Sequence, residues 1–313
     1  MRLVYLCSVA RITVVGSINM DMVVRAPRFA QPGETITGED FMAVPGGKGA
    51  NQAVAAQRLG GIVAMVGGVG EDAFGAAMTH GLAEEGIDVR RVDVRGGWAS
   101  GIALITVNAE GENTIIVVPG ANGTLTPDDV ALARETVRSA GVLLLQLEIP
   151  IAVVQAAAAM AHDAGRMVIL NAAPATTLPD SLLGLVDYLI VNESELFTVS
   201  EFAAADQQAA ITNLHDRGAA AVVVTLGRAG ARLVPRVGEP TLVRAYTVDV
   251  VDTTAAGDAF VGAFAVALSE GLPPVDALRR GNAAGALAVT RAGAQPSLPT
   301  RDEVDTWLRA QAE

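Results

Sequence analysis

The residue pattern best suited to group transfer is the segment Asp252-Thr-Thr-Ala-Ala-Gly-Asp258, which runs into an apolar stretch with a helical pattern. Small residues before a helix leave its first backbone amides unpaired at the positive end of the helix dipole. The unpaired amides of Ala255, Ala256, Gly257 and Asp258 would form an anion hole for charge on a transferring phosphoryl group. Asp258 lies at the mouth of this hole, where a carboxylate can accept a proton from an attacking hydroxyl. The alternative is an aspartate that only caps its own helix.

A second candidate site is the segment Pro45-Gly-Gly-Lys-Gly-Ala-Asn-Gln52. Consecutive glycines let a ligand approach the backbone closely, and Lys48 and Asn51 add polar groups at the start of the next helix. The segment is not a Walker A loop, because Met42 stands where that motif has its first glycine and Gly49 where it has serine or threonine. A purely structural turn is the alternative.

Polar side chains also follow the first predicted strand, in Gly16-Ser-Ile-Asn-Met-Asp21. Asn19 and Asp21 alternate along an extended segment, so they lie on one side of it. A carboxylate and an amide suit adjacent sugar hydroxyls, and ligands of open α/β sheets bind beyond the carboxyl ends of strands. An Asx turn is the alternative.

Two later strand ends carry groups that suit a nucleotide. Asn192 and Glu195 share a first helical turn, where their oxygens can hold Mg²⁺ through water; the alternative is a capping asparagine beside a solvated glutamate. Thr225-Leu-Gly-Arg-Ala-Gly230 is a strand end with a glycine-rich turn that can cradle phosphates. The segment Gly68-Val-Gly-Glu-Asp-Ala73 matches a dinucleotide fingerprint, but its two carboxylates would lie beside the pyrophosphate, so we interpret it as a tight turn.

Short β-branched runs alternate with helical patterns, which predicts an α/β fold with a doubly wound, mainly parallel sheet flanked by helices. The predicted strands are 12–16, 62–67, 142–147, 167–171, 188–191 and 221–226. The predicted helices are 50–59, 73–85, 127–139, 151–164, 206–217, 257–270, 274–290 and 301–310. Residues 22–44 and 98–121 contain strand patterns without a helix, which favours a small β-sheet lid; ordinary surface hairpins are the alternative.

Composition excludes several classes of partner. The 313 residues carry a net charge of −12, which disfavours broad contact with nucleic acid or anionic lipid. No apolar run approaches the roughly 20 residues that span a bilayer. Cys7 is the only cysteine, so no intrachain disulfide forms and we expect a reducing, cytoplasmic compartment. Residues 1–10 faintly resemble a secretion signal, but we interpret them as an N-terminal extension of a cytoplasmic protein.

Taken in order, these segments resemble the ribokinase (PfkB) family of sugar and nucleoside kinases. The resemblance runs from Ile12 to about Leu308, and its most specific pieces are Gly46-Gly-Lys-Gly-Ala-Asn51 and the segment that ends at Asp258. It implies one ribokinase-like domain over residues 11–313, whose lid closes over the sugar and pairs two subunits into a homodimer. It also implies ATP-dependent phosphorylation of the 5-hydroxyl of D-ribose, with Asp258 as the base.

The resemblance also assigns ligands to individual residues of this sequence. Besides Asp258, the sugar would contact Asn19, Asp21, Gly46, Gly47, Lys48, Asn51 and Glu148. The ATP site would be formed by Asn192, Thr225, Gly227, Arg228, Gly230, Gly257 and Asn282, with Glu195 organising Mg²⁺. A monovalent cation, typically K⁺, would be held mostly through carbonyls by Asp252, Thr254, Ala288, Arg291, Gly293 and Ser297.

Three other functions stay open at this stage. Deoxyribose, or a nucleoside such as adenosine, fits the same motifs. A nicotinamide-dependent oxidoreductase would use residues 68–73. A catalytically silent sugar sensor is the third possibility, although a sensor has no need of the base Asp258.

Overall fold

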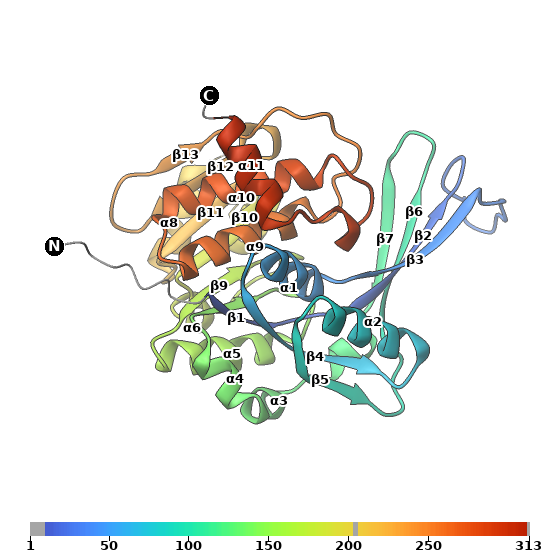
Figure 1. Cartoon of the computed structure of the whole chain (residues 1–313), viewed down its shortest axis with the longest axis horizontal. Helices are drawn as coiled ribbons and strands as arrows, with labels where there is room; N and C mark the ends of the chain where they lie inside the picture. The colour runs from blue at the N-terminus through green and yellow to red at the C-terminus, as the bar shows by residue number, and fades with distance from the viewer. Residues whose placement is uncertain (1–9, 203–205, 312–313) are drawn as a thin grey trace.

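The buried apolar runs form a nine-stranded sheet in the computed structural model, which describes residues 10–202 and 206–311 (Figure 1). The strands are β1 (Arg11–Val15), β4 (Ile62–Gly70), β5 (Asp88–Arg95), β8 (Val142–Leu145), β9 (Met167–Asn171), β10 (Tyr188–Asn192), β11 (Ala221–Thr225), β12 (Ala231–Pro235) and β13 (Thr241–Val243). Their order is β13-β12-β11-β10-β9-β8-β1-β4-β5, and the strands from β11 to β5 are parallel. The predicted doubly wound, mainly parallel sheet is confirmed.

Helices cover both faces of this sheet because its central strands are apolar on both sides. Val14 and Leu144 pack into one core, whereas the next residues, Val15 and Leu145, pack into the other. The first layer contains α1 (Lys48–Arg58), α2 (Ala73–Glu84), α9 (Ala256–Ser269), α10 (Pro274–Ala288) and α11 (Arg301–Ala310). The second layer contains α3 (Pro127–Leu132), α4 (Arg134–Ser139), α5 (Ile151–Asp163), α6 (Asp180–Leu183), α7 (Glu193–Ser200) and α8 (Gln207–Asp216).

The sequence misplaced a few elements for identifiable reasons. The helix predicted over 127–139 is broken at Ala133, so it forms α3 and α4. The edge strand β5 was missed because Arg and Asp interrupt its apolar residues, as suits a strand with a neighbour on only one side. The sequence reading also left out α6, the antiparallel strands β12 and β13, and α7 beyond its first turn.

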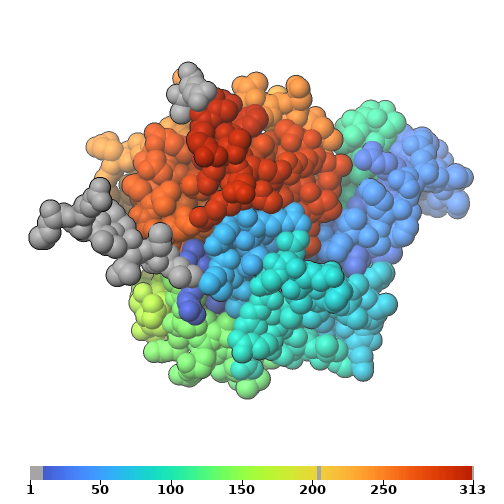
Figure 2. Space-filling view, viewed as in Figure 1, coloured from blue at the N-terminus to red at the C-terminus, as the bar shows by residue number. Residues whose placement is uncertain are grey.

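Four strands form a second sheet that projects from one side of the main body (Figures 1 and 2). They are β2 (Asn19–Arg25), β3 (Asp40–Gly46), β6 (Gly101–Val107) and β7 (Asn113–Val118), in the order β3-β2-β6-β7. Asn19 pairs with Gly46 and with Gly101, so the sheet begins at the candidate ligand-binding residues. No helix among the described residues is both long enough and apolar enough to cross a bilayer.

Close backbone packing fixes where α1 begins. A Cβ at Gly49 would lie 2.5 Å from the backbone nitrogen of Ser17, just beyond β1. Such an overlap forces the helix away from the strand, because the contacted atom is backbone and cannot rotate aside.

We therefore expect Gly49→Ala to lower the free energy of unfolding by about 1–3 kcal/mol. The matched control is Gly81→Ala, within α2, where a Cβ meets no atom within 4 Å. That change should stabilise the protein by about 0.5–1 kcal/mol, because alanine favours a helix. Thermal and urea denaturation would measure both, and equal effects of the two substitutions would contradict the packing argument.

Candidate active site

The candidate site lies at the switch point of the sheet. Strands β4 and β5 lie on one side of β1, and β8 to β13 lie on the other. Ligands of open α/β sheets bind beyond the carboxyl ends of the strands at such a point. The chain leaving β1 carries Asn19 and Asp21, and the chain leaving β8 carries Gln146 and Glu148.

Asn19 and Asp21 lie in the extended strand β2, which rules out the Asx-turn alternative. Asn19 Oδ1 accepts a hydrogen bond of 2.8 Å from Asn122 Nδ2, and Asn122 Oδ1 accepts one of 2.9 Å from Ile18 N. Asn122 therefore fixes the orientation of Asn19. No motif marked it, because its role depends on a contact between residues 103 positions apart.

The glycine-rich segment is packed against the same residues. A Cβ at Gly46 would overlap the Asp21 carboxylate at 2.1 Å, and one at Gly47 would lie 2.7 Å from Asn19 N. Gly47 is also the N-cap of α1, with a φ of 87° that favours glycine. The two glycines thus bring the start of α1 into contact with β2.

The positive end of α1 is occupied by Glu148. Its Oε2 accepts hydrogen bonds from Lys48 N at 3.0 Å and from Ser17 Oγ at 2.5 Å. A carboxylate at a helix N-terminus is stabilised by the helix dipole. Glu148 therefore joins the loop after β8 to the segment that contains Lys48.

Asp258 does not cap its own helix, so that alternative is wrong. The N-cap of α9 is Ala255, which makes no side-chain cap, and Asp258 follows in the first turn. Its carboxylate reaches α1, where Oδ2 accepts from Asn51 Nδ2 at 3.0 Å and Oδ1 from Gln52 Nε2 at 2.9 Å. Asp258 is only 7% exposed. Burial raises its pKa, against the opposing effects of Lys48, Gln52 and Asn51.

The first turn of α9 leaves part of the predicted anion hole open. Within residues 10–202 and 206–311, the amides of Ala255 and Gly257 have no protein acceptor. The amide of Ala256 donates to Thr253 O at 3.3 Å, so the prediction of four open amides is wrong for Ala256. Ala255 has a φ of 58°, an uncommon conformation for alanine that turns the chain into the helix.

Four carboxylates surround the amine of Lys48. Burial lowers the pKa of Lys48, but Asp258, Glu148, Glu195 and Asp21 outweigh burial and raise it. The pKa of Asp21 is raised to about 7, mainly by burial and to a smaller extent by repulsion from Glu148 and Asp258. The site therefore holds excess negative charge around one half-buried cation.

A cavity of about 500 Å³ lies beside the first turn of α9. Six residues predicted to bind ATP line it: Thr225, Gly227, Arg228, Gly230, Gly257 and Asn282. Asn282 Nδ2 donates to Val243 O at 2.9 Å and to Arg244 O at 3.2 Å, so it anchors the cavity wall.

Sequence reasoning missed the rest of the cavity wall. Gly281 and Gly285 lie four residues apart on α10, and this small-residue spacing was a usable signal. The irregular segment with Tyr246 and Val250 offered none, because only the fold brings it to the cavity.

Asn192 and Glu195 form the capping pair that was the alternative to a magnesium site. Asn192 Oδ1 accepts from Glu195 N at 2.8 Å, and Glu195 Oε2 accepts from Asn192 N at 2.8 Å. Burial raises the pKa of Glu195, and Lys48 lies close enough to oppose this. In the described parts of the chain, no three His, Cys, Asp or Glu side chains are grouped to hold a metal.

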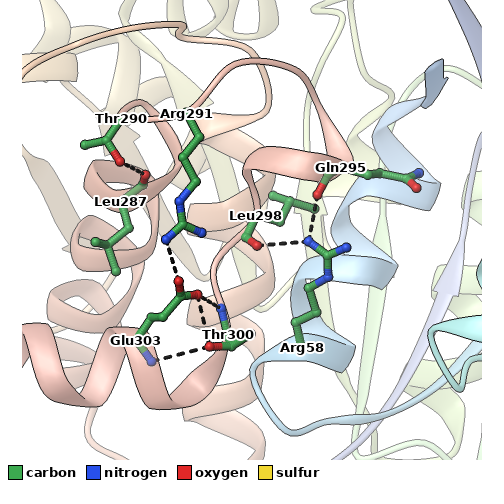
Figure 3. Close-up of polar contacts among 8 residues, drawn as sticks. All are labelled: Arg58, Leu287, Thr290, Arg291, Gln295, Leu298, Thr300 and Glu303. Atoms are coloured by element: carbon green, nitrogen blue, oxygen red, sulfur yellow. Dashed lines mark hydrogen bonds and ion pairs between the residues drawn. The ribbon is translucent and has the colours of Figure 1, made fainter. Parts of the chain in front are cut away.

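The segment expected to hold a monovalent cation is brought together around Asp252. Its Oδ1 accepts from Thr254 N at 2.9 Å and its Oδ2 from Gly293 N at 2.9 Å. The Arg291 side chain is engaged with Glu303 (Figure 3). Asp252 thus brings Thr254 and Gly293, two of the residues expected to hold the cation, next to each other.

Arg58 ties this loop to α1. It donates to Gln295 O at 2.7 Å and to Leu298 O at 3.0 Å (Figure 3). Ser297, another expected cation ligand, lies between Gln295 and Leu298 in the sequence and is buried. Ala288 and Arg291 flank Val289, whose carbonyl oxygen accepts a hydrogen bond of 3.2 Å from Asp252 N.

The dinucleotide alternative has no support in the geometry. Strand β4 runs to Gly70, and Asp72 caps α2 through Gly75 N at 2.7 Å. The other Asp72 oxygen accepts from Ser100 N at 2.7 Å, so a carboxylate occupies the region that a pyrophosphate would need. The interpretation of the whole segment as a tight turn is therefore wrong for Gly68 to Gly70, which continue β4, and the turn is limited to Glu71 and Asp72.

A nucleotide-sized cavity beside a buried carboxylate and an open helix N-terminus is the arrangement of a small-molecule kinase. The pfkB family carbohydrate kinase model matches residues 9–301. The chain therefore belongs to the pfkB family of carbohydrate kinases.

Individual relatives cover nearly the whole chain. A ribokinase from Haemophilus influenzae is 42% identical over 300 residues, covering 95% of this chain and 98% of the relative. A deoxyribokinase from Salmonella typhi is 34% identical over 301 residues, covering 95% and 98%. The structure of Arabidopsis thaliana ribokinase complexed with ribose and ATP matches with a TM-score of 0.89 at 36% identity, covering 96% and 99%.

The raised pKa of Asp21 predicts a pH-dependent stability. Asp21 is 8% exposed, and its pKa is about 7 in the fold against 3.8 ordinarily. Between pH 3.8 and pH 7, Asp21 keeps its proton in the folded chain but has lost it in the unfolded chain. The free energy of unfolding therefore falls as pH rises through this range.

At pH 8, without ligand, we expect Asp21→Asn to have a higher melting temperature than the parent. Its free energy of unfolding should be larger by about 1–4 kcal/mol. The advantage should shrink as pH falls from 7 towards 4. Asp163→Asn, at the exposed end of α5, is the control. A difference in melting temperature that stays constant over this range would show that Asp21 ionises normally.

Proposed function

We propose that this protein transfers the γ-phosphoryl group of ATP to the 5-hydroxyl of D-ribose. The observation that carries the proposal is that two consecutive residues in the first turn of α9 face different parts of the site. Gly257 faces the nucleotide-sized cavity, whereas the next residue, Asp258, reaches Asn51 and Gln52 on the other side. A phosphoryl group and a hydroxyl would meet at that turn.

Asp258 acts as the base in this proposal. It accepts the proton of the ribose hydroxyl as the oxygen attacks the γ-phosphorus, and the bond to the ADP oxygen breaks. The open amides of Ala255 and Gly257 stabilise the charge that spreads over the phosphoryl oxygens. Alignment of the hydroxyl requires the sugar to be fixed, and the polar groups for this are Asn19, Asp21, Lys48, Asn51 and Glu148 together with the backbone at Gly46 and Gly47.

Two cations complete the proposed site. Mg²⁺, bound through the phosphates and water near Asn192 and Glu195, would neutralise phosphate charge. K⁺ near Asp252, Thr254, Ala288, Arg291, Gly293 and Ser297 would add fixed positive charge beside the anion hole. The cytoplasmic compartment expected from the single cysteine, Cys7, is part of this proposal.

We further propose that the projecting sheet is a lid that pairs two subunits. Ile115, Ile116, Val117 and Val118 of β7 are each 45–65% exposed. An apolar strand this exposed at a sheet edge favours association with a second copy. Light scattering should give twice the chain mass, and Ile116→Asp should yield monomers; an unchanged mass on this substitution would argue against the lid interface.

A substrate panel tests the reaction itself. ADP release should be fastest with D-ribose among D-ribose, deoxyribose, fructose and adenosine, and it should fall when Mg²⁺ or K⁺ is omitted. Preference for deoxyribose would instead point to the activity named for the Salmonella typhi relative. If none of the four substrates caused ADP to be released, the assignment would be refuted.

Asp258→Asn tests the base. We expect kcat to fall by at least about 10²-fold, because general-base catalysis contributes on this scale. Ribose and ATP should still bind, as measured by calorimetry. Near-normal turnover in this variant would remove Asp258 from the role of base.

A further inference from the structure

The base is connected to a buried network of amide side chains. Gln52 is fully buried, and its Nε2 donates to Asp258 Oδ1 at 2.9 Å and to Asn171 Oδ1 at 3.0 Å. Its Oε1 accepts from Gln146 Nε2 at 2.6 Å, and Asn171 Nδ2 donates to Ile190 O at 3.3 Å. The network thus runs from the backbone of β10 to the carboxylate of Asp258.

We propose that Gln52 is a positioning residue that holds the Asp258 carboxylate in one orientation and leaves Oδ2 as the oxygen that accepts the proton. The proposal rests on the proposed kinase function, because it names a task for Asp258 as a base. Neither Gln52 nor its partners Gln146 and Asn171 was assigned a role from the sequence.

Hydrogen-bond polarity fixes how the Gln52 amide is turned. Both N–H groups of Gln52 have acceptors, Asp258 Oδ1 and Asn171 Oδ1, and its oxygen has the donor Gln146. Rotating the amide by half a turn would place its oxygen against the carboxylate and its nitrogen against another N–H donor. Because an amide has two donors and one acceptor atom, only one orientation satisfies this set.

The two oxygens of Asp258 consequently differ. Oδ1 is held from the interior by Gln52, where solvent does not reach. Oδ2 is bound by Asn51 at 3.0 Å, and Asn51 Oδ1 is buried without a partner among the described residues. A sugar hydroxyl that donates to Asn51 Oδ1 would satisfy that atom and lie beside Oδ2.

Burial makes this arrangement effective. Polar side chains buried in a core destabilise a protein unless every group is paired, whereas apolar ones pack there without this cost. Gln52 and Gln146 are both fully buried between β8, β9 and the helices α1 and α9. Gln52 Nε2 donates to the ionisable group, Asp258, and Gln146 Nε2 supports Gln52 by donating to its Oε1.

The experiment compares Gln52→Leu with Gln57→Leu. Gln57 also lies on α1, and its amide serves only the turn to β4, through Val63 N at 3.2 Å. In Gln52→Leu we expect kcat to fall about 10–100-fold with little change in the dissociation constants of ribose and ATP. Gln57→Leu should keep the kcat of the parent. A loss confined to KM, or an equal loss in both variants, would overturn the positioning role.

The pH profile separates positioning from simple loss of packing. A hydrogen bond to an ionised carboxylate lowers its pKa, so its removal should move the acidic limb of kcat to higher pH. The charged groups near Asp258, namely Lys48, Glu148, Asp21 and Glu195, stay in place in both variants. An unchanged limb in Gln52→Leu would contradict the proposal.

A readout without catalysis keeps the two hypotheses apart. Carbon-13 NMR can follow the titration of Asp258, assigned as the carboxyl signal that Asp258→Asn removes. Its pKa should rise in Gln52→Leu even if no sugar on the panel is phosphorylated. If Gln52→Leu does not fold, Gln146→Met supplies a second variant, since Gln146 is one hydrogen bond further from Asp258. This change should raise the pKa of Asp258 by a smaller amount.

Discussion

The structure depends on the contact between the N-terminal turns of α1 and α9, where Asp258 accepts hydrogen bonds from Asn51 and Gln52. The two helices can meet so closely because small residues line their contact: a Cβ at Gly262 would lie 2.6 Å from that of Ala55. Their positive ends differ. That of α1 is occupied by Glu148, whereas that of α9 has no side-chain cap, so only α9 can offer its amides to a ligand.

Charge in the site is arranged for ligands rather than for the stability of the free protein. Asp21, Glu148, Glu195 and Asp258 lie around Lys48, and burial of two of these carboxylates, Asp21 and Asp258, beside the others is unfavourable. Asp21 responds by holding its proton up to a pH of about 7. Bound hydroxyls and cations would satisfy these oxygens. The raised pKa is therefore the sign of a site that is incomplete until substrate enters.

Motifs at strand ends and helix starts allowed the sheet and six residues that line the cavity to be predicted, because the chain order and the glycine spacing are local signals. The capping pair Asn192 and Glu195 shows the limit of such signals, since the same two residues also suited a metal. Gln52 was passed over for another reason: its partner Asn171 is 119 positions away, and only the folded sheet brings them together. The helix predicted over 127–139 is divided at Ala133, and no glycine or proline marks that break in the sequence.

The projecting sheet joins the proposed sugar-binding residues to the proposed subunit interface through three neighbouring strands. Strand β2 begins at Asn19, continues through Asp21 and ends at Arg25, and it pairs along its length with β6. Strand β6 in turn pairs with β7, whose apolar residues are exposed. Because neighbouring strands move as one hydrogen-bonded unit, a sugar held by Asn19 and Asp21 would restrain the outer face of the lid. Association of a second copy with that face would, by the same linkage, favour the conformation that holds the sugar.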